Sequence, residues 1–454
     1  MSSSASELSA AHKSWRTKVF ASTWLSYVGF YFCRKPFSAT KAAIGHETGW
    51  SATTLGNIWA AYLITYALGQ FVAAAMGSKL GPRRNVLLGM AISIAVTFAM
   101  GLTLSVPMLI GLVAMNGLAQ ATGWSGNVGT MAGWFHKHER GRVMGVWSNC
   151  FTVGALTSGW VMAWVLNMHA EGEPAPWRLC FYVGAAVLTA VWIQFFFFQR
   201  NKPEDVGLAP VEDPVGERDQ TGKPTQTGKP TDTGKPTETE KTAVSGKPAD
   251  GFMGLSRSAW TNLLLIAAFY FFAKFIRYSM WSWAAYFLQK NYGLTGSSAN
   301  VYATAFDLMG IPGVFVTGWL SDRFFGSRRA GVALLMLLSM TGITALLTLF
   351  GSTSVAIFAV LLGLVGFTLY GPDAILSGAG AMDVGSRKNA TFATAMISGG
   401  GSLGAVVQEL VIARMYDSKH GELGPVFILI FGSAALASLF CGALVWRNRQ
   451  GRGV

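Results

Sequence analysis

Seven ionisable residues of this sequence lie inside long apolar stretches. They are Arg34, Lys35, Lys274, Arg277, Asp307, Asp373 and Glu409. Placing a charge in hydrocarbon costs free energy. An ionisable residue inside a membrane-length apolar stretch therefore usually binds a substrate or couples an ion. The chemistry that these residues offer is the recognition of a charged solute.

Arg34 and Arg277 offer the most specific chemistry, because one lies in each half of the chain at an equivalent depth. Guanidinium stays charged at physiological pH and presents a planar fork of donors that matches phosphate or carboxylate. Two unpaired cations would repel each other and hold the halves apart, whereas an anion bound between them would neutralise the charge and let the halves rock. An empty carrier would then change state slowly, which predicts obligatory exchange. The alternative is that each arginine pairs with a carboxylate such as Asp307. No carboxylate lies near Arg34 in its own stretch, which favours binding.

The other intramembrane charges admit more than one role. Lys274 lies three positions before Arg277 and shares its helix face, so it either adds a third positive donor or pairs with Asp307. A structural ion pair is the favoured role of Asp307. Asp373 follows a Gly-Pro pair and is a pairing partner or a proton site, and Glu409 is a structural partner or lies near the outer end.

Aromatic residues accompany both arginines. Tyrosine hydroxyls can bind an oxyanion or sugar hydroxyls, and Tyr31 and Tyr278 are the preferred candidates. Most membrane aromatics instead pack or anchor at the interface, and this applies to each of the neighbours Tyr27, Trp281 and Trp283.

The composition indicates where these charges must lie. The chain has 454 residues, of which 51% are hydrophobic and 13% charged, and its mean hydropathy is +0.39. A soluble domain is about 25% charged, so much of this surface must face a lipid bilayer. The net charge of +13 lies in short loops between apolar runs, without a basic and aromatic patch, which argues against nucleic acid as a partner.

Twelve apolar stretches are long enough to cross a bilayer as helices of about 20 residues. They lie at 17–44, 52–76, 85–105, 107–134, 142–167, 178–199, 258–290, 297–320, 330–350, 354–381, 390–415 and 425–446. The sequence therefore predicts an all-α integral membrane protein with six-helix bundles at 17–199 and 258–446. The Gly-Lys-Pro-Thr repeats between them lack apolar residues and predict a disordered linker at 200–257.

Lysine and arginine gather on one side of the predicted bundles, which therefore faces the cytoplasm. That side carries both termini (1–16 and 447–454) and the linker, whereas the opposite loops hold only Lys41, Arg178, Lys290, Arg414 and Lys419. The two halves also repeat a basic loop after their second helix, and we assign these loops to the conformational change. Their residues are Arg83 and Arg84 in the first half and Asp322, Arg323 and Arg328 in the second. Matching halves are the layout of major facilitator transporters, which hold substrate between the halves near mid-membrane.

The sequence shows no constellation for covalent chemistry. The Gly-Lys-Pro repeats do not match a phosphate loop, which needs Gly-Lys-Ser/Thr at the start of a helix. The four cysteines, Cys33, Cys150, Cys180 and Cys441, lie in apolar stretches and are expected to be small buried hydrophobes. We therefore expect neither an enzyme nor a metal or other cofactor.

Several segments resemble motifs of the organophosphate:phosphate antiporter family, a branch of the major facilitators. They are 31–38, which contains Cys33-Arg34-Lys35-Pro36, then 117–124, 134–141, 202–208, 277–278, 310–322 and 370–372. The resemblance covers almost the whole chain outside the linker. It implies exchange of inorganic phosphate for glycerol phosphate, hexose phosphates or phosphoglycerates, with Arg34 and Arg277 gripping the phosphate. One branch of that family is a membrane sensor of hexose phosphate that works with a histidine kinase.

Three positions depart from the glycerol-phosphate type of that family. Gln70 aligns with its lysine, Phe151 with its histidine and Gly129 with its arginine. These departures make glycerol phosphate a poor candidate substrate. Asp373 and Lys274 either compensate for them or tune a different headgroup.

These observations predict a monomeric secondary transporter of the inner (plasma) membrane that exchanges a phosphorylated metabolite for inorganic phosphate by alternating access. Arg34 and Arg277 bind the phosphoryl group, and the second-rank candidates are Tyr31, Gln70, Lys274, Tyr278 and Asp373. Two alternatives remain open. One is a proton-coupled symporter of another organic anion, with Asp307, Asp373 and Glu409 as proton sites, and the other is a sensor of sugar phosphate.

Overall fold

The structure, a computed structural model, describes residues 9–168, 174–211, 257–324, 329–384 and 390–450. Within these ranges the chain forms helices and no strand. The predicted linker is described only at its two ends, so the Gly-Lys-Pro-Thr repeats lie outside the described residues, as does Arg328.

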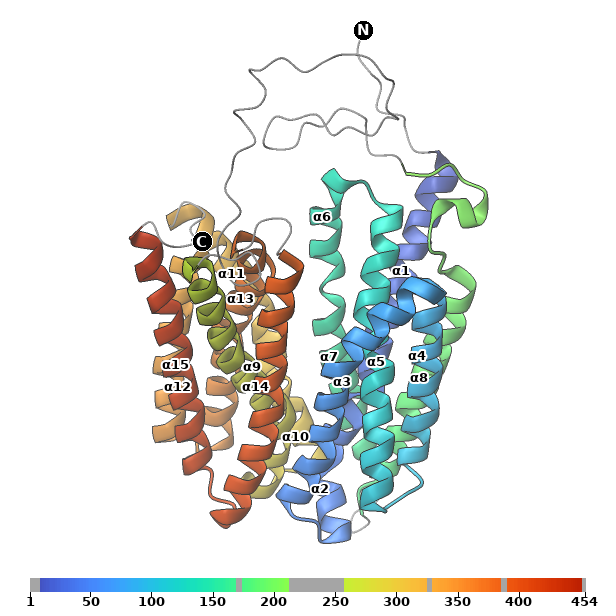
Figure 1. The fold of residues 1–454 in the computed structure, drawn as a ribbon. Helices are drawn as coiled ribbons and strands as arrows, with labels where there is room; N and C mark the ends of the chain where they lie inside the picture. The colour runs from blue at the N-terminus through green and yellow to red at the C-terminus, as the bar shows by residue number, and fades with distance from the viewer. Residues whose placement is uncertain (1–8, 169–173, 212–256, 325–328, 385–389, 451–454) are drawn as a thin grey trace.

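The helices form two groups that stand side by side (Figure 1). The first group contains α1 (Ala10–Phe32), α2 (Lys35–Thr48), α3 (Ala52–Leu80), α4 (Pro82–Met100), α5 (Val106–Trp134), α6 (Lys137–Trp147), α7 (Cys150–Leu166) and α8 (Trp177–Phe198), followed by the short 3-10 helix η1 (Pro203–Val206). The second contains α9 (Arg257–Tyr292), α10 (Gly296–Ala303), α11 (Ala305–Phe324), α12 (Arg329–Phe350), α13 (Val355–Val384), α14 (Ala390–Ser418) and α15 (Gly424–Arg449). Three predicted helices are in fact broken in two, as α1–α2, α6–α7 and α10–α11.

The break between α1 and α2 follows from Pro36, which lies in the first turn of α2. Proline has no amide hydrogen, so it cannot donate to the carbonyl four residues earlier, at Phe32. That carbonyl packs against Gly184 of α8, where a Cβ would lie only 2.1 Å from the Phe32 oxygen. A glycine is therefore required at this contact, and the break leaves Arg34 between two helix ends.

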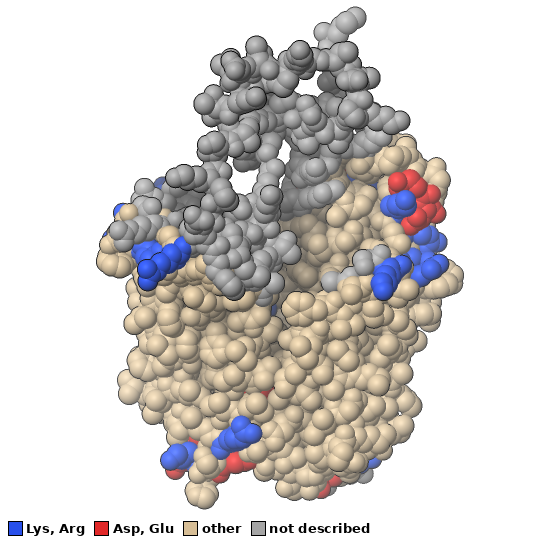
Figure 2. Space-filling view, viewed as in Figure 1, with Lys and Arg blue, Asp and Glu red and all other residues tan. Residues whose placement is uncertain are grey.

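The described surface is that of a protein that crosses a membrane several times. Eleven helical stretches in the described residues are long and apolar enough to span a bilayer. The interrupted helix formed by α1 and α2 is not among them. Large apolar side chains such as Phe71, Phe315 and Leu349 are more than two-thirds exposed. Figure 2 shows Lys, Arg, Asp and Glu at the two ends of the visible face, with a wide uncharged band between them. The prediction of an all-α multi-pass membrane protein is confirmed.

The two groups of helices are joined at the end that carries α2 and α10 (Figure 1). There α3 packs against α14, α7 against α10 and α2 against α9. Asp417 accepts hydrogen bonds from the backbone amides of Ala52, at 3.1 Å, and Thr53, at 2.7 Å, which begin α3. The start of α1 and the end of α15 lie at the opposite end of the molecule.

Four of the five basic residues expected in the outer loops lie within helices instead, namely Lys41, Arg178, Lys290 and Arg414. Lys41 is completely buried in α2, and Arg414 lies in α14 with an exposed side chain. The predicted stretches 17–44 and 390–415 already contained Lys41 and Arg414, and the helices extend further, α2 to Thr48 and α14 to Ser418.

Candidate functional site

A cavity of about 460 Å³ lies between the two groups of helices, and both groups line it. The first group contributes α1, α3, α5 and α7, and the second contributes α9, α11 and α13. Its charged lining residues are Arg34, Lys274, Arg277, Asp307 and Asp373. Its aromatic lining residues are Tyr27, Tyr31, Tyr66, Trp124, Phe151, Tyr270, Tyr278, Trp281 and Tyr370. The structure thus brings Arg34 and Arg277 to one cavity from opposite halves.

Arg34 is held as a buried cation without a carboxylate partner among the described residues. Its Nε donates a hydrogen bond to Gln120 Oε1 at 2.9 Å. Its guanidinium carbon lies 4.8 Å from the ring centroid of Tyr31 and 5.0 Å from that of Tyr66, which is cation–π geometry. Its Nη2 atom is buried and has no hydrogen-bond partner in the part of the chain that the structure describes. A buried donor left without a partner requires an explanation, and an anion in the cavity would supply one.

Arg277 forms an ion pair with Asp373 of α13. Lys274, one turn earlier on α9, reaches the same carboxylate at 3.1 Å. The picture of two unpaired cations is therefore wrong for Arg277 and applies to Arg34 only. Lys274 pairs with Asp373 rather than with Asp307, because α13 brings Asp373 against the face of α9 that carries both cations.

Asp307 accepts a hydrogen bond from the Tyr370 hydroxyl. It forms no ion pair with Arg34, Lys274 or Arg277 in the part of the chain that the structure describes. Its electrostatic partner from the first half is Lys35, whose ammonium group also lies 4.6 Å from the Trp281 ring centroid. Asp307 thus lies in the electrostatic field of both Lys35 and Arg277, and it forms an ion pair with neither among the described residues.

Glu409 lies outside the cavity, in the joined end of the molecule. It forms an ion pair with Lys41 of α2, and neither side chain has any exposed surface. Lys41 Nζ also donates to Ser282 Oγ at 2.7 Å, and Trp283 Nε1 donates to Glu409 at 3.1 Å. The expectation that Glu409 is a structural partner agrees with this geometry, and Trp283 belongs to this cluster rather than to the cavity.

The remaining candidates divide into those at the cavity and those away from it. Tyr31 and Tyr278 line the cavity, whereas Gln70 is half-buried in α3 and does not. Arg83 donates from its backbone to Asn201 Oδ1 at 2.8 Å and from its guanidinium to the Phe196 carbonyl at 2.5 Å. Arg84 and Arg323 are exposed. Asp322 lies in α11, and its side chain is outside the described residues.

Sequence reasoning missed two polar residues that touch these charges, Lys41 and Gln120. Lys41 was counted with the outer loops, although the predicted stretch 17–44 contains it. Gln120 was noticed only as part of a motif, although a glutamine one turn after Asn116 inside an apolar stretch signals a polar helix face.

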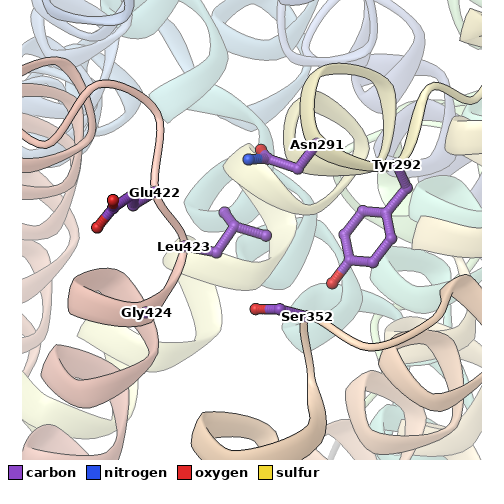
Figure 3. A pocket seen from close by; sticks show the side chains of 6 residues that line it. All are labelled: Asn291, Tyr292, Ser352, Glu422, Leu423 and Gly424. Carbon is purple, nitrogen blue, oxygen red and sulfur yellow. The ribbon is translucent and has the colours of Figure 1, made fainter.

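A second cavity, of about 320 Å³, lies in the second group where α9 ends and α15 begins (Figure 3). It is lined by Asn291, Tyr292, Ser352, Glu422, Leu423 and Gly424. Figure 3 shows the Glu422 carboxylate turned away from Tyr292 and Ser352. With one charged lining residue that faces elsewhere, this cavity offers no evident anion or cation site.

Two bundles of membrane-spanning helices around a central charged cavity define a polytopic membrane transporter. The family model described as the Major Facilitator Superfamily matches residues 19–408. The chain belongs to the Major Facilitator Superfamily. The prediction of a transporter rather than an enzyme is confirmed by this membership.

The chain is similar to several proteins over nearly their whole length. It is 26% identical to the glycerol-3-phosphate transporter of Bacillus subtilis (strain 168), over 98% of this chain and 95% of that protein. It is also 26% identical to the glucose-6-phosphate exchanger SLC37A2 of Bos taurus, covering 96% of this chain and 94% of that one. The probable hexose phosphate transport protein of Chlamydia pneumoniae is 26% identical, covering 94% and 90%. The predicted resemblance to organophosphate transporters is confirmed.

Solved structures support the fold. The D-xylose-proton symporter superposes with a TM-score of 0.68 at 12% identity, over 94% of this chain and 97% of that one. A bacterial homologue of the lysosomal transporter Spinster, inward-facing and occupied, gives 0.62 at 17% identity, over 95% of each chain.

Proposed function

We propose that this protein exchanges an organophosphate for inorganic phosphate across the plasma membrane by alternating access. The phosphoryl group binds between Arg34 and Arg277. The observation that carries this proposal is the buried, unpartnered Nη2 of Arg34, which belongs to a residue lining the same cavity as Arg277. The relatives named as glycerol-phosphate and glucose-phosphate carriers give the same substrate class.

The charge of the cavity supports an anionic solute. Three cations and two carboxylates line it, Arg34, Lys274 and Arg277 against Asp307 and Asp373, which leaves a surplus of one positive charge. A cleft with a charge surplus in low-dielectric walls attracts the opposite ion. Because Asp373 already occupies Arg277, an incoming phosphate shares or displaces that carboxylate. The exchange of one anionic partner for another is the step that we assign to substrate binding.

The joined end supports alternating access. We propose that the units 17–199 and 258–446 rock about the cavity, and that both termini face the cytoplasm. Lys13, Arg16, Lys79, Arg83 and Arg84 lie at the end of the termini, in keeping with the positive-inside rule. With this orientation, the contacts of α2, α3 and α14 close the cavity toward the outside. One chain supplies the whole cavity lining, so we propose a monomer as the functional unit.

The test is uptake of radiolabelled phosphate into proteoliposomes that contain the purified protein. We expect uptake into vesicles preloaded with phosphate and little into empty ones, and organophosphates should compete. Asp307 and Asp373 in the cavity lining support one other function, proton-coupled symport of an organic anion. Uptake driven by a pH gradient into vesicles without internal phosphate would favour that symporter and contradict exchange.

Replacing Asp373 with asparagine is expected to tighten phosphate binding by about tenfold, which corresponds to about 1.4 kcal/mol. The substitution removes the carboxylate that competes with phosphate for Arg277 and leaves Lys274 unpaired as well. Titration with inorganic phosphate, followed by intrinsic tryptophan fluorescence to which the cavity-lining Trp124 and Trp281 contribute, measures this affinity. Glu422→Gln, in the second cavity, is the control. Unchanged or weaker binding in Asp373→Asn would show that Asp373 does not compete with the substrate.

A further inference from the structure

We propose that Gln120 of α5 is the positioning residue that orients Arg34 toward the substrate while leaving its charge uncompensated. This inference rests on the proposed function, because it concerns how the phosphate-binding arginine is held. Gln120 is fully buried and is not among the residues that line the cavity, so it acts through Arg34 rather than on the solute.

The helix break creates the need for such a residue. Cys33 and Arg34 lie between α1 and α2, so no continuous helix fixes the direction in which Arg34 leaves the backbone. Polar groups at helix ends require partners from outside the helix. Asn116 of α5 supplies one, because its Nδ2 donates to the Cys33 carbonyl at 2.9 Å. The break is thus attached to α5 one residue before Arg34.

Gln120 lies one helical turn after Asn116 and attaches the side chain of Arg34. Its Oε1 accepts from Arg34 Nε and from the Tyr62 hydroxyl, each at 2.9 Å. Its Nε2 donates to Ser93 Oγ and to Asn116 Oδ1, each at 3.2 Å. Ser93 Oγ in turn donates to Asn116 Oδ1 at 2.6 Å.

This network fixes which end of the Gln120 amide faces Arg34. The two acceptors beside Nε2 require the amide nitrogen on their side, so the oxygen must point toward the arginine. The oxygen engages Nε, the donor nearest the backbone, and Nη2 is left without a hydrogen-bond partner among the described residues. Gln120 thereby fixes the guanidinium group of Arg34 through Nε and leaves Nη2 as the donor for the phosphoryl group.

The choice of an amide rather than a carboxylate has a consequence for binding. A glutamate would accept the same hydrogen bond, but its charge would cancel that of Arg34. A neutral acceptor holds the guanidinium and leaves its full charge for an anion. Arg277, in contrast, is paired with Asp373. In this proposal Arg34 is therefore the arginine whose charge is uncompensated before substrate binds.

The experiment is a double-mutant cycle that combines Gln120→Leu with Arg34→Lys. Inorganic phosphate is titrated into each purified protein, and binding is followed by tryptophan fluorescence. We expect Gln120→Leu alone to weaken phosphate binding about tenfold or more, since a hydrogen bond to a charged group is lost. In the Arg34→Lys background, which lacks Nε, the same substitution should change affinity less than about twofold, because coupled residues are not additive.

Two further variants separate positioning from general damage. Asn127→Leu removes another buried amide of α5 that bonds α1, at 2.8 Å to Ser26 Oγ, and should leave phosphate affinity unchanged. Gln120→Glu keeps the acceptor toward Arg34 but loses the two hydrogen bonds that Nε2 donates, so a thermal melt is needed to show that the variant is folded. It should weaken binding at least as much as Gln120→Leu.

Each outcome of the cycle bears on one claim. Equal loss in both arginine backgrounds, or wild-type affinity in Gln120→Glu, would overturn the positioning role of Gln120 and leave phosphate exchange intact. Failure of the wild-type protein to bind phosphate would overturn the proposed function, and this inference with it.

Discussion

Arg34→Lys is expected to lower phosphate exchange by about a hundredfold or more. Lysine keeps the positive charge but lacks the guanidinium Nε. Its single ammonium group cannot bond Gln120 and also present a forked pair of donors to the cavity. The variant loses the bond to Gln120 and the forked contact to phosphate. Hydrogen bonds to charged groups contribute about 1.5–3 kcal/mol each, and two of them account for at least a factor of 100 at about 1.4 kcal/mol per tenfold.

The measurement is the initial rate of exchange in phosphate-loaded proteoliposomes, together with the phosphate affinity of the purified protein. Arg449→Lys, at the exposed end of α15, makes the same chemical change away from the cavity and should exchange at the wild-type rate. Wild-type affinity in Arg34→Lys would remove Arg34 from the binding site.

Glu409→Gln is expected to shift the conformational equilibrium by about a hundredfold toward the state that is open at the joined end. The substitution leaves Lys41 as an unpaired cation with no exposed surface whenever the joined end is closed. Removing one partner of a buried ion pair costs about 3–5 kcal/mol. This cost falls mainly on the state in which the joined end is closed, because opening that end exposes Lys41 to water. Exchange slows because the carrier then spends most of its time in the open state.

A cysteine at Ala413 reports the state of this interface. Ala413 is 1% exposed and faces Gly56 of α3, and the four native cysteines are buried. A membrane-impermeant thiol reagent on the side of the joined end should label Ala413→Cys at least about tenfold faster when Glu409→Gln is also present. Slow labelling in both backgrounds would show that the Lys41–Glu409 pair does not hold this end closed.

The chain offers a matched control and a rescue for this prediction. The pair between Arg178 and Glu47 is about 40% exposed on both sides and lies within the first group of helices. Glu47→Gln should change labelling little, because exposed ion pairs contribute about 0–1 kcal/mol. The exchange of charges in Lys41→Glu with Glu409→Lys restores an opposite pair and should recover slow labelling.

Much of the architecture follows from the sequence, because the constraint that imposes it is local. A bilayer demands about 20 apolar residues for each crossing, and that length is visible in the chain without knowledge of its folding. The same cost of charge in hydrocarbon makes Arg34 and Arg277 stand out, and the equivalence of the two halves indicates that they face one another. The helix break was missed even though its cause, Pro36, is local, since apolar periodicity continues across it.

The partners of these charges were decided by the tertiary structure. Asp307 and Asp373 both lie among apolar neighbours along the chain, so the sequence does not distinguish them. Only the packing of α13 against α9 brings Asp373 into ion pairs with Lys274 and Arg277. Lys41 and Glu409 are far apart in sequence and meet only where the two groups of helices join. An ion pair depends on distances of a few ångströms between separate helices, and neither composition nor periodicity contains that distance. The sequence by itself determined which residues carry the charge, and the tertiary structure decided that Arg34 is held by the neutral Gln120 and has no carboxylate partner among the described residues.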